Sequence, residues 1–232
     1  MLLELPAAFA STRDQLHALA EHVVSSAYFH ATAHIGLRPT PRGFGTPVFG
    51  DRERVRVDGT GLVHERAGEE RRAEITTLRA AATFLGVPLG APDVYTPSTA
   101  VDPDTPLEVD HDAALALGDW YALAGALLHD LRTEHSDQPS TESQIWPEHF
   151  DLACEIGNAD AGTRANYGAS PGDAAIPEPY LYVGPWEAGR HTGLLAAYPF
   201  GGALTYAEMR RAGEAGAAGR QFFEDAIALV TG

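Results

Sequence analysis

The feature that most constrains this chain is a hairpin signal in its first half. Asp58-Gly59 separates two short apolar pairs, Val55 with Val57 and Leu62 with Val63. An Asp-Gly step flanked by alternating apolar residues is typical of a tight turn between antiparallel strands. We therefore expect an antiparallel sheet in this part of the molecule.

Helical periodicity or helix caps occur at four places in the sequence. The spacing predicts a first helix from about Thr12 to Tyr28 and a second that begins near Ile75 and stops at Gly86. A third helix is predicted over residues 111–132, where an apolar stripe repeats at helical spacing. Thr205 and Glu208 form a capping box that opens a terminal helix.

Further strands are predicted where apolar and polar residues alternate. They cover residues 30–37, 145–156 (IWPEHFDLACEI), 179–186 (PYLYVGPW) and 194–200 (LLAAYPF). The predicted fold class is α+β, with one or two antiparallel sheets and four helices packed on one side.

The order of elements allows two pseudo-repeated halves, each reading helix, three strands, helix. They cover residues 1–86 and 110–232 of what we expect to be a single domain, 1–232. A Pro- and Asp-rich connection over residues 87–109 joins them, and it is predicted to be either a linker or a lid.

The charge of the chain disfavours two classes of partner. The net charge is −16, from 32 acidic against 16 basic residues, and such a surface repels phosphate backbones and anionic lipids. We expect neither nucleic acid nor membrane as a partner. The arginines between Arg52 and Arg72 alternate with acidic residues, which favours a solvated, mixed-charge surface over an anion-binding patch.

The basic residues exclude several mechanisms. All 16 are arginines, in an Ala-, Gly- and Pro-rich background that suggests a high-GC bacterial genome. Without a lysine the chain cannot form a pyridoxal phosphate Schiff base or complete a P-loop nucleotide site.

The single cysteine, Cys154, permits no intramolecular disulfide and no Fe-S cluster or multi-cysteine zinc site. Its place on an apolar strand face predicts burial. The chain also shows no secretory leader and no apolar stretch of about 20 residues, so we expect a cytoplasmic protein.

A candidate metal site lies in the strand predicted over 145–156. Strand geometry places His149 and Asp151 on its polar face, roughly 7 Å apart, as two ligands of a divalent metal. The alternative is a solvated polar face without a metal. A divalent metal is therefore left open as a cofactor.

A candidate ligand site involves the strand over 179–186 and the loop before it. Tyr180, Tyr182 and Trp186 share one face, and Arg164 precedes them in a Gly- and Pro-rich loop, 164–173. Aromatic rows are common in cores, but Tyr and Trp also line ligand pockets. Since consecutive strands tend to lie side by side, we expect Asp151 and His149 to adjoin this row, beneath the loop.

Three segments, WPEHFDLACEIG, ANYGASPGD and PEPYLYVGPW, resemble an actinobacterial domain-of-unknown-function family. The resemblance covers mainly residues 145–186 and implies no activity. The sequence leaves three hypotheses: an enzyme or metal protein with its site at His149 and Asp151, a binding module for a small molecule, and a non-catalytic structural or interaction protein. A homo-oligomer is open under each of them.

Overall fold

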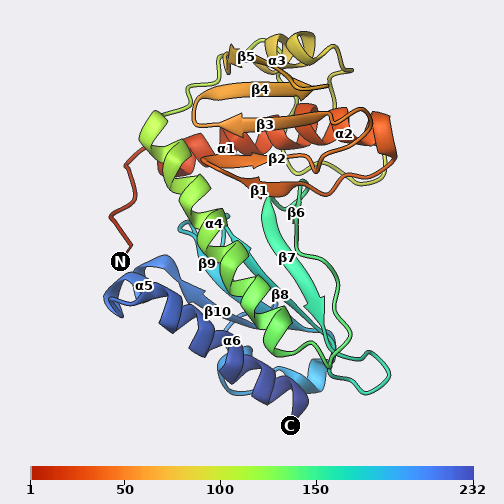
Figure 1. Cartoon of the computed structure of the whole chain (residues 1–232). Helices are drawn as coiled ribbons and strands as arrows, with labels where there is room; N and C mark the ends of the chain where they lie inside the picture. The colour runs from red at the N-terminus through yellow and green to blue at the C-terminus, as the bar shows by residue number, and fades with distance from the viewer. Residues whose placement is uncertain (1) are drawn as a thin grey trace. The chain divides into compact units, whose positions relative to one another are not determined.

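The computed structural model describes residues 2–232 and has an α+β fold, with helices and two five-stranded antiparallel sheets (Figure 1). The chain forms two compact units. The N-terminal unit contains residues 5–122 and 145–150, and the C-terminal unit contains residues 2–4, 123–144 and 151–232. The predicted fold class is confirmed.

The N-terminal unit begins with one continuous helical run. It consists of α1 (Phe9–Leu19), a π-helical turn η1 (Ala20–Val24) and α2 (Ser25–Thr32). The strand predicted over 30–37 is wrong, because the helix continues to Thr32 and ends at Ala33, whose φ is 61°. An alternation supplied by alanines is weak evidence for a strand, since alanine has the highest helix propensity.

Five strands follow in chain order across one sheet: β1 (Arg38–Thr40), β2 (Gly43–Gly45), β3 (Arg54–Asp58), β4 (Gly61–Arg66) and β5 (Glu69–Glu74). The predicted hairpin is confirmed, with Asp58 opposite Gly61 and Gly59 at a φ of 60° in the turn. The β5 edge strand was not predicted, because its sequence EERRAE is polar and mostly exposed.

Arginines in this sheet and in its turns form ion pairs with neighbouring carboxylates. Asp58 makes ion pairs with Arg42, Arg56 and Arg72 at 3.1, 3.1 and 2.9 Å. Burial alone raises the pKa of Asp58, but hydrogen bonds from Arg72 and Arg56 outweigh it and hold that pKa below its ordinary value. The charged run therefore forms a mixed ion-pair network.

Two predicted helices of this part of the chain are confirmed. α3 (Leu78–Leu85) is capped by the Thr77 side chain and ends at Gly86, whose φ is 72°. α4 (His111–Glu134) follows the connection, which has no helix or strand. At Gly118 a Cβ would lie 2.6 Å from backbone atoms of Arg42 and Gly43, so α4 packs directly on the chain there.

The strand predicted over 145–156 is interrupted. β6 (Gln144–Trp146) is followed by a turn over residues 147–150, and only then does β7 (Asp151–Ile156) begin. The break occurs at Phe150, which has a φ of 55°, an unusual value for a bulky residue.

Contacts within the N-terminal unit hold Phe150 in this conformation. The ring stacks on His17 at 5.0 Å and meets Phe44 edge-on at the same distance, while Tyr121 donates a hydrogen bond to its carbonyl at 2.6 Å.

The second sheet has the order β10-β9-β8-β7-β6, and its strands β7, β8 (Ala165–Ser170), β9 (Tyr180–Pro185) and β10 (Gly202–Thr205) lie in the C-terminal unit. β9 confirms the predicted strand over 179–186. The strand over 194–200 is wrong, since a 3₁₀ turn η3 (Gly193–Ala196) lies there. The predicted loop 164–173 is wrong for most of its length, because Ala165–Ser170 is β8, a central strand.

The last helix is divided, as its glycines suggest. α5 (Tyr206–Arg211) opens with the capping box of Thr205 and Glu208, and α6 (Ala215–Thr231) begins after Gly213, whose φ is 80°. α6 packs closely against β9 and the second half of α4, since a Cβ on Gly219 would come within 3 Å of Leu127 and Leu181. Each sheet has five strands, whereas three strands were predicted in each half of the sequence.

Candidate functional site

The sheet of the C-terminal unit has two different faces. Leu152, Cys154, Tyr167 and Leu181 point to the side of α6, where Tyr167 packs on Phe223 at 6.2 Å. The register places the alternate residues on the opposite side. We call this second side the polar-aromatic face, and its main residues are Asp151, Glu155, Arg164, Asn166, Tyr180, Tyr182 and Trp186.

Tyr182 connects two strands that are not neighbours. β8 lies between β7, which carries Asp151, and β9, which carries Tyr182. The prediction that these two strands adjoin is therefore wrong. Tyr182 nevertheless donates a hydrogen bond to Asp151, because its ring lies across Gly168 of β8. A Cβ at Gly168 would be only 2.5 Å from the ring. Glycine is therefore the residue that lets Tyr182 reach Asp151.

Tyr180 makes a second tyrosine-carboxylate pair at this end of the face. Its hydroxyl donates to Asp173 at 2.6 Å, and its ring lies 6.2 Å from that of Tyr182 and 6.1 Å from that of Phe200. Burial, followed by the nearby Asp151 and Asp173 carboxylates, raises the pKa of both phenols. Both tyrosines therefore stay neutral hydrogen-bond donors at neutral pH.

Arg164 and Trp186 meet at the other end of the face. The guanidinium of Arg164 stacks over the Trp186 ring at 4.3 Å and makes an ion pair with Glu155. Trp186 in turn donates from Nε1 to Asn166 at 3.3 Å. These contacts fix the Arg164 side chain, which remains 32% exposed.

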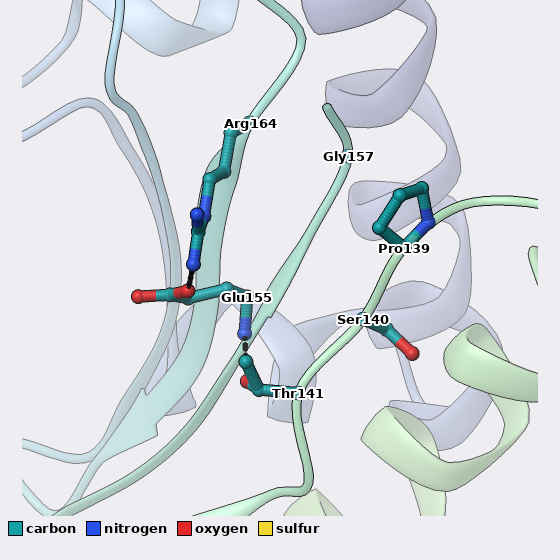
Figure 2. Close-up of a pocket in the computed structure, with 6 residues that line it drawn as sticks. All are labelled: Pro139, Ser140, Thr141, Glu155, Gly157 and Arg164. Atoms are coloured by element: carbon teal, nitrogen blue, oxygen red, sulfur yellow. Dashed lines mark hydrogen bonds and ion pairs between the residues drawn. The ribbon is translucent and has the colours of Figure 1, made fainter. Parts of the chain in front are cut away.

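A small pocket opens beside this arginine. Figure 2 shows Arg164 and Glu155 pointing toward one another, with the stretch 139–141 along the other wall. Thr141 accepts a hydrogen bond from the Glu155 backbone at 2.9 Å, and Ser140 adds a second hydroxyl to the wall. The pocket has a volume of about 140 Å³. Cation, carboxylate and hydroxyls thus converge on one space.

The structure separates the two predicted metal ligands by environment. His149 is exposed in the turn before β7, whereas Asp151 is 7% exposed and bonded to Tyr182. Their predicted common strand face does not exist, because the left-handed Phe150 stands between them. Among residues 2–232, no group of three or more His, Cys, Asp or Glu side chains is placed to hold a metal ion. The metal site stays a prediction without a third ligand.

Cys154 is buried, as its alternation predicts, at 3% exposure. Burial raises the pKa of its thiol to about 11. A neutral, inaccessible thiol is a poor nucleophile, so Cys154 has a packing role.

A buried polar cluster in the N-terminal unit was not predicted. Glu21 and His22 lie in the π-helical turn and are both 0% exposed. The Glu21 carboxylate accepts hydrogen bonds from the backbone amides of Ser98 and Thr99 at 2.9 and 2.8 Å. His22 contacts the Thr99 carbonyl through Nε2 at 3.1 Å, and its own carbonyl accepts from Gly90 at 3.0 Å.

These bonds show that the cluster anchors the connection 87–109 to the helix. In the sequence, the only sign of this cluster is the pair of adjacent polar residues, Glu21 and His22, within the apolar run of the first helix. Helical spacing assigns both residues to an exposed face, so their burial was not predicted. Burial near Glu21 also affects His17, whose pKa is lowered because desolvation outweighs the carboxylate.

The comparisons with known proteins assign no family to the chain. No protein-family model, no curated protein and no solved structure matches the chain. Within residues 2–232, none of the helices has the length and apolar character needed to cross a membrane.

Proposed function

We propose that this chain is a small-molecule-binding protein whose ligand occupies the Arg164 pocket on the polar-aromatic face. The observation that carries the proposal is the fixed guanidinium beside the pocket. Trp186 and Glu155 hold Arg164 in place before any ligand arrives, and a preorganised group loses less entropy on binding.

The lining of the pocket points to a small carboxylic acid with an amine or hydroxyl group. A guanidinium has five N–H donors, and the Glu155 ion pair uses Nη2, which leaves donors for a carboxylate. Glu155 and the hydroxyls of Ser140 and Thr141 suit the amine or hydroxyl. A space of about 140 Å³ corresponds to the liquid volume of roughly five waters, the size of a simple amino or hydroxy acid.

We include Tyr180 and Tyr182 in the same proposed site, where they would contact an apolar part of the ligand. Tyr180 and Tyr182 lie further along the same face, with Asp151 as acceptor of one hydroxyl. A ligand with an apolar extension would lie along these rings, because aromatic side chains supply large contact areas at low entropic cost.

The experiment measures binding of L-alanine and L-lactate by calorimetry and by ligand-observed NMR. We expect Arg164→Gln to weaken binding at least about tenfold, since it removes a charged hydrogen-bond donor. Arg54→Gln is the matched control, because Arg54 is also 32% exposed and also bound to a glutamate, Glu65. The control should bind as the unchanged protein does.

Two outcomes would contradict the proposal. Equal affinity in Arg164→Gln would place the ligand elsewhere. Absence of binding, together with a dimer in solution that Trp186→Ala dissociates, would support the alternative of a non-catalytic interaction protein, because Trp186 is a large side chain left 53% exposed.

A further inference from the structure

A second cavity lies on the helix-covered side of the same sheet, within the C-terminal unit. It has a volume of about 210 Å³ and is formed by β7, the chain before and within β8, the residues after α4 and the end of α6. Its lining includes His135, Gln138, Ile156, Tyr167, Ile227 and Thr231. It shares Gly157 with the Arg164 pocket but opens on the opposite face.

Tyr167 is the residue that points to a ligand. The residue is 1% exposed, yet among residues 2–232 its hydroxyl is not one of the fully buried side-chain atoms that lack a partner, so the hydroxyl faces open space rather than packed protein. A phenol hydroxyl that faces a cavity needs a hydrogen-bond partner from any ligand that displaces its water, because losing hydration without replacement is unfavourable. Since Tyr167 lines the cavity, the hydroxyl has space to meet a partner that enters it.

The remaining walls restrict that partner to an uncharged, mainly apolar molecule. Ile156 and Ile227 are 3% and 8% exposed and provide the apolar wall. His135, which also lines the cavity, already contacts Glu224 at 3.2 Å. An ion would lose part of its hydration there, and among the described residues no Asp, Glu or Arg side chain lines the cavity to replace it.

The size of the cavity further narrows the class of ligand that could bind there. An apolar protein cavity of about 150 Å³ can hold benzene, so 210 Å³ accommodates one ring with a small substituent. We propose that the C-terminal unit binds a small neutral aromatic or aliphatic alcohol in this cavity, with its polar group hydrogen-bonded to the Tyr167 hydroxyl. The proposal is independent of the Arg164 pocket.

The test compares p-cresol with toluene, which differ by the hydroxyl group. Binding is measured by calorimetry and by shifts of the Ile227 and Thr231 amide signals, since neither residue lines the Arg164 pocket. We expect saturable p-cresol binding that Tyr167→Phe weakens about fivefold, the effect of one neutral hydrogen bond. Toluene affinity should be the same in both proteins, because toluene cannot use the hydroxyl.

A filled cavity provides the second arm of the test. Thr231→Phe places a ring into the cavity from the last turn of α6 and should abolish binding of both probes. Ala228→Phe adds the same ring at an exposed position of that helix outside the lining, and should leave binding intact. Thermal melting checks that each variant is folded.

No saturable p-cresol binding to the unchanged protein would overturn the proposal. Unchanged binding in folded Thr231→Phe would overturn it as well, since the probe would then sit elsewhere. Neither result depends on Arg164, so this inference and the proposed function can fail separately.

Discussion

Gly168 permits the contact between Tyr182 and Asp151 because it has no side chain. It lies in the middle of β8, opposite Tyr182 on one neighbour and Ala153 on the other. The space above it lets the Tyr182 ring extend across the strand to Asp151. The geometry of one end of the polar-aromatic face thus depends on a residue that contributes no chemistry to it.

Replacing this glycine tests that dependence. In Gly168→Ala the new Cβ would lie 2.5 Å from the Tyr182 ring, so the ring must move and release Asp151. We expect the free energy of unfolding to fall by about 1 to 3 kcal/mol, the usual range for overpacking, as measured by urea denaturation. Gly216→Ala is the control, because a Cβ there meets no atom within 4 Å. The control should keep or slightly raise stability, and equal stability of both variants would contradict the role of Gly168.

Phe150 is the second residue whose conformation organises its surroundings. A left-handed φ in a phenylalanine is unfavourable by itself and persists only where neighbouring contacts determine it. The contacts with His17, Phe44 and Tyr121 do so, and they turn the chain between Trp146 and Asp151.

At the scale of elements, the π-helical turn η1 explains how a long irregular connection is ordered. A π turn shifts the backbone hydrogen-bond pattern of the helix and leaves a carbonyl available for other donors. The His22 carbonyl accepts from Gly90, while the Glu21 carboxylate accepts from Ser98 and Thr99. The connection is therefore fastened to the helix along its first part.

Glu21→Ala should loosen this fastening. The variant leaves the Ser98 and Thr99 amides without their acceptor, and we expect a loss of about 2 kcal/mol or more in unfolding free energy. Hydrogen exchange of the Gly90, Ser98 and Thr99 amides should accelerate. Glu108→Ala changes an exposed glutamate of the same connection and serves as control. Unaltered exchange in Glu21→Ala would show that other contacts hold the segment.

At the scale of the whole molecule, the two compact units are interleaved in sequence. The N-terminal unit takes residues 145–150 and the first part of α4 from beyond the connection. Phe150, Trp120 and Tyr121 are among its most buried side chains, at 1%, 1% and 0% exposure. The predicted halves, 1–86 and 110–232, therefore do not coincide with the compact units.

Fragments test this arrangement. A fragment of residues 1–109 lacks the buried side chains of Trp120, Tyr121 and Phe150. We therefore expect it to show no cooperative thermal unfolding by circular dichroism. A fragment of residues 1–150 contains the whole N-terminal unit and should regain a cooperative transition. Cooperative folding of the shorter fragment would show that the connection is a true boundary.

The sequence alone determined the elements whose signals are local. The hairpin at Asp58-Gly59, the end of α3 at Gly86 and the capping box of Thr205 and Glu208 depend on residues within a few positions of one another. The alternation within β7 and β9 also survives, which is why Asp151, Tyr180 and Tyr182 share the predicted face. Short-range geometry is encoded in the order of residues.

Only the tertiary structure decided the rest, because its causes lie far apart in the chain. The break at Phe150 depends on rings at positions 17, 44 and 121, and the burial of Glu21 depends on amides at 98 and 99. β8 is rich in small residues and gains strand structure from pairing with β7 and β9. The site at Arg164 follows from that pairing, since β8 brings Arg164 beside Glu155 of one strand and Trp186 at the end of the other.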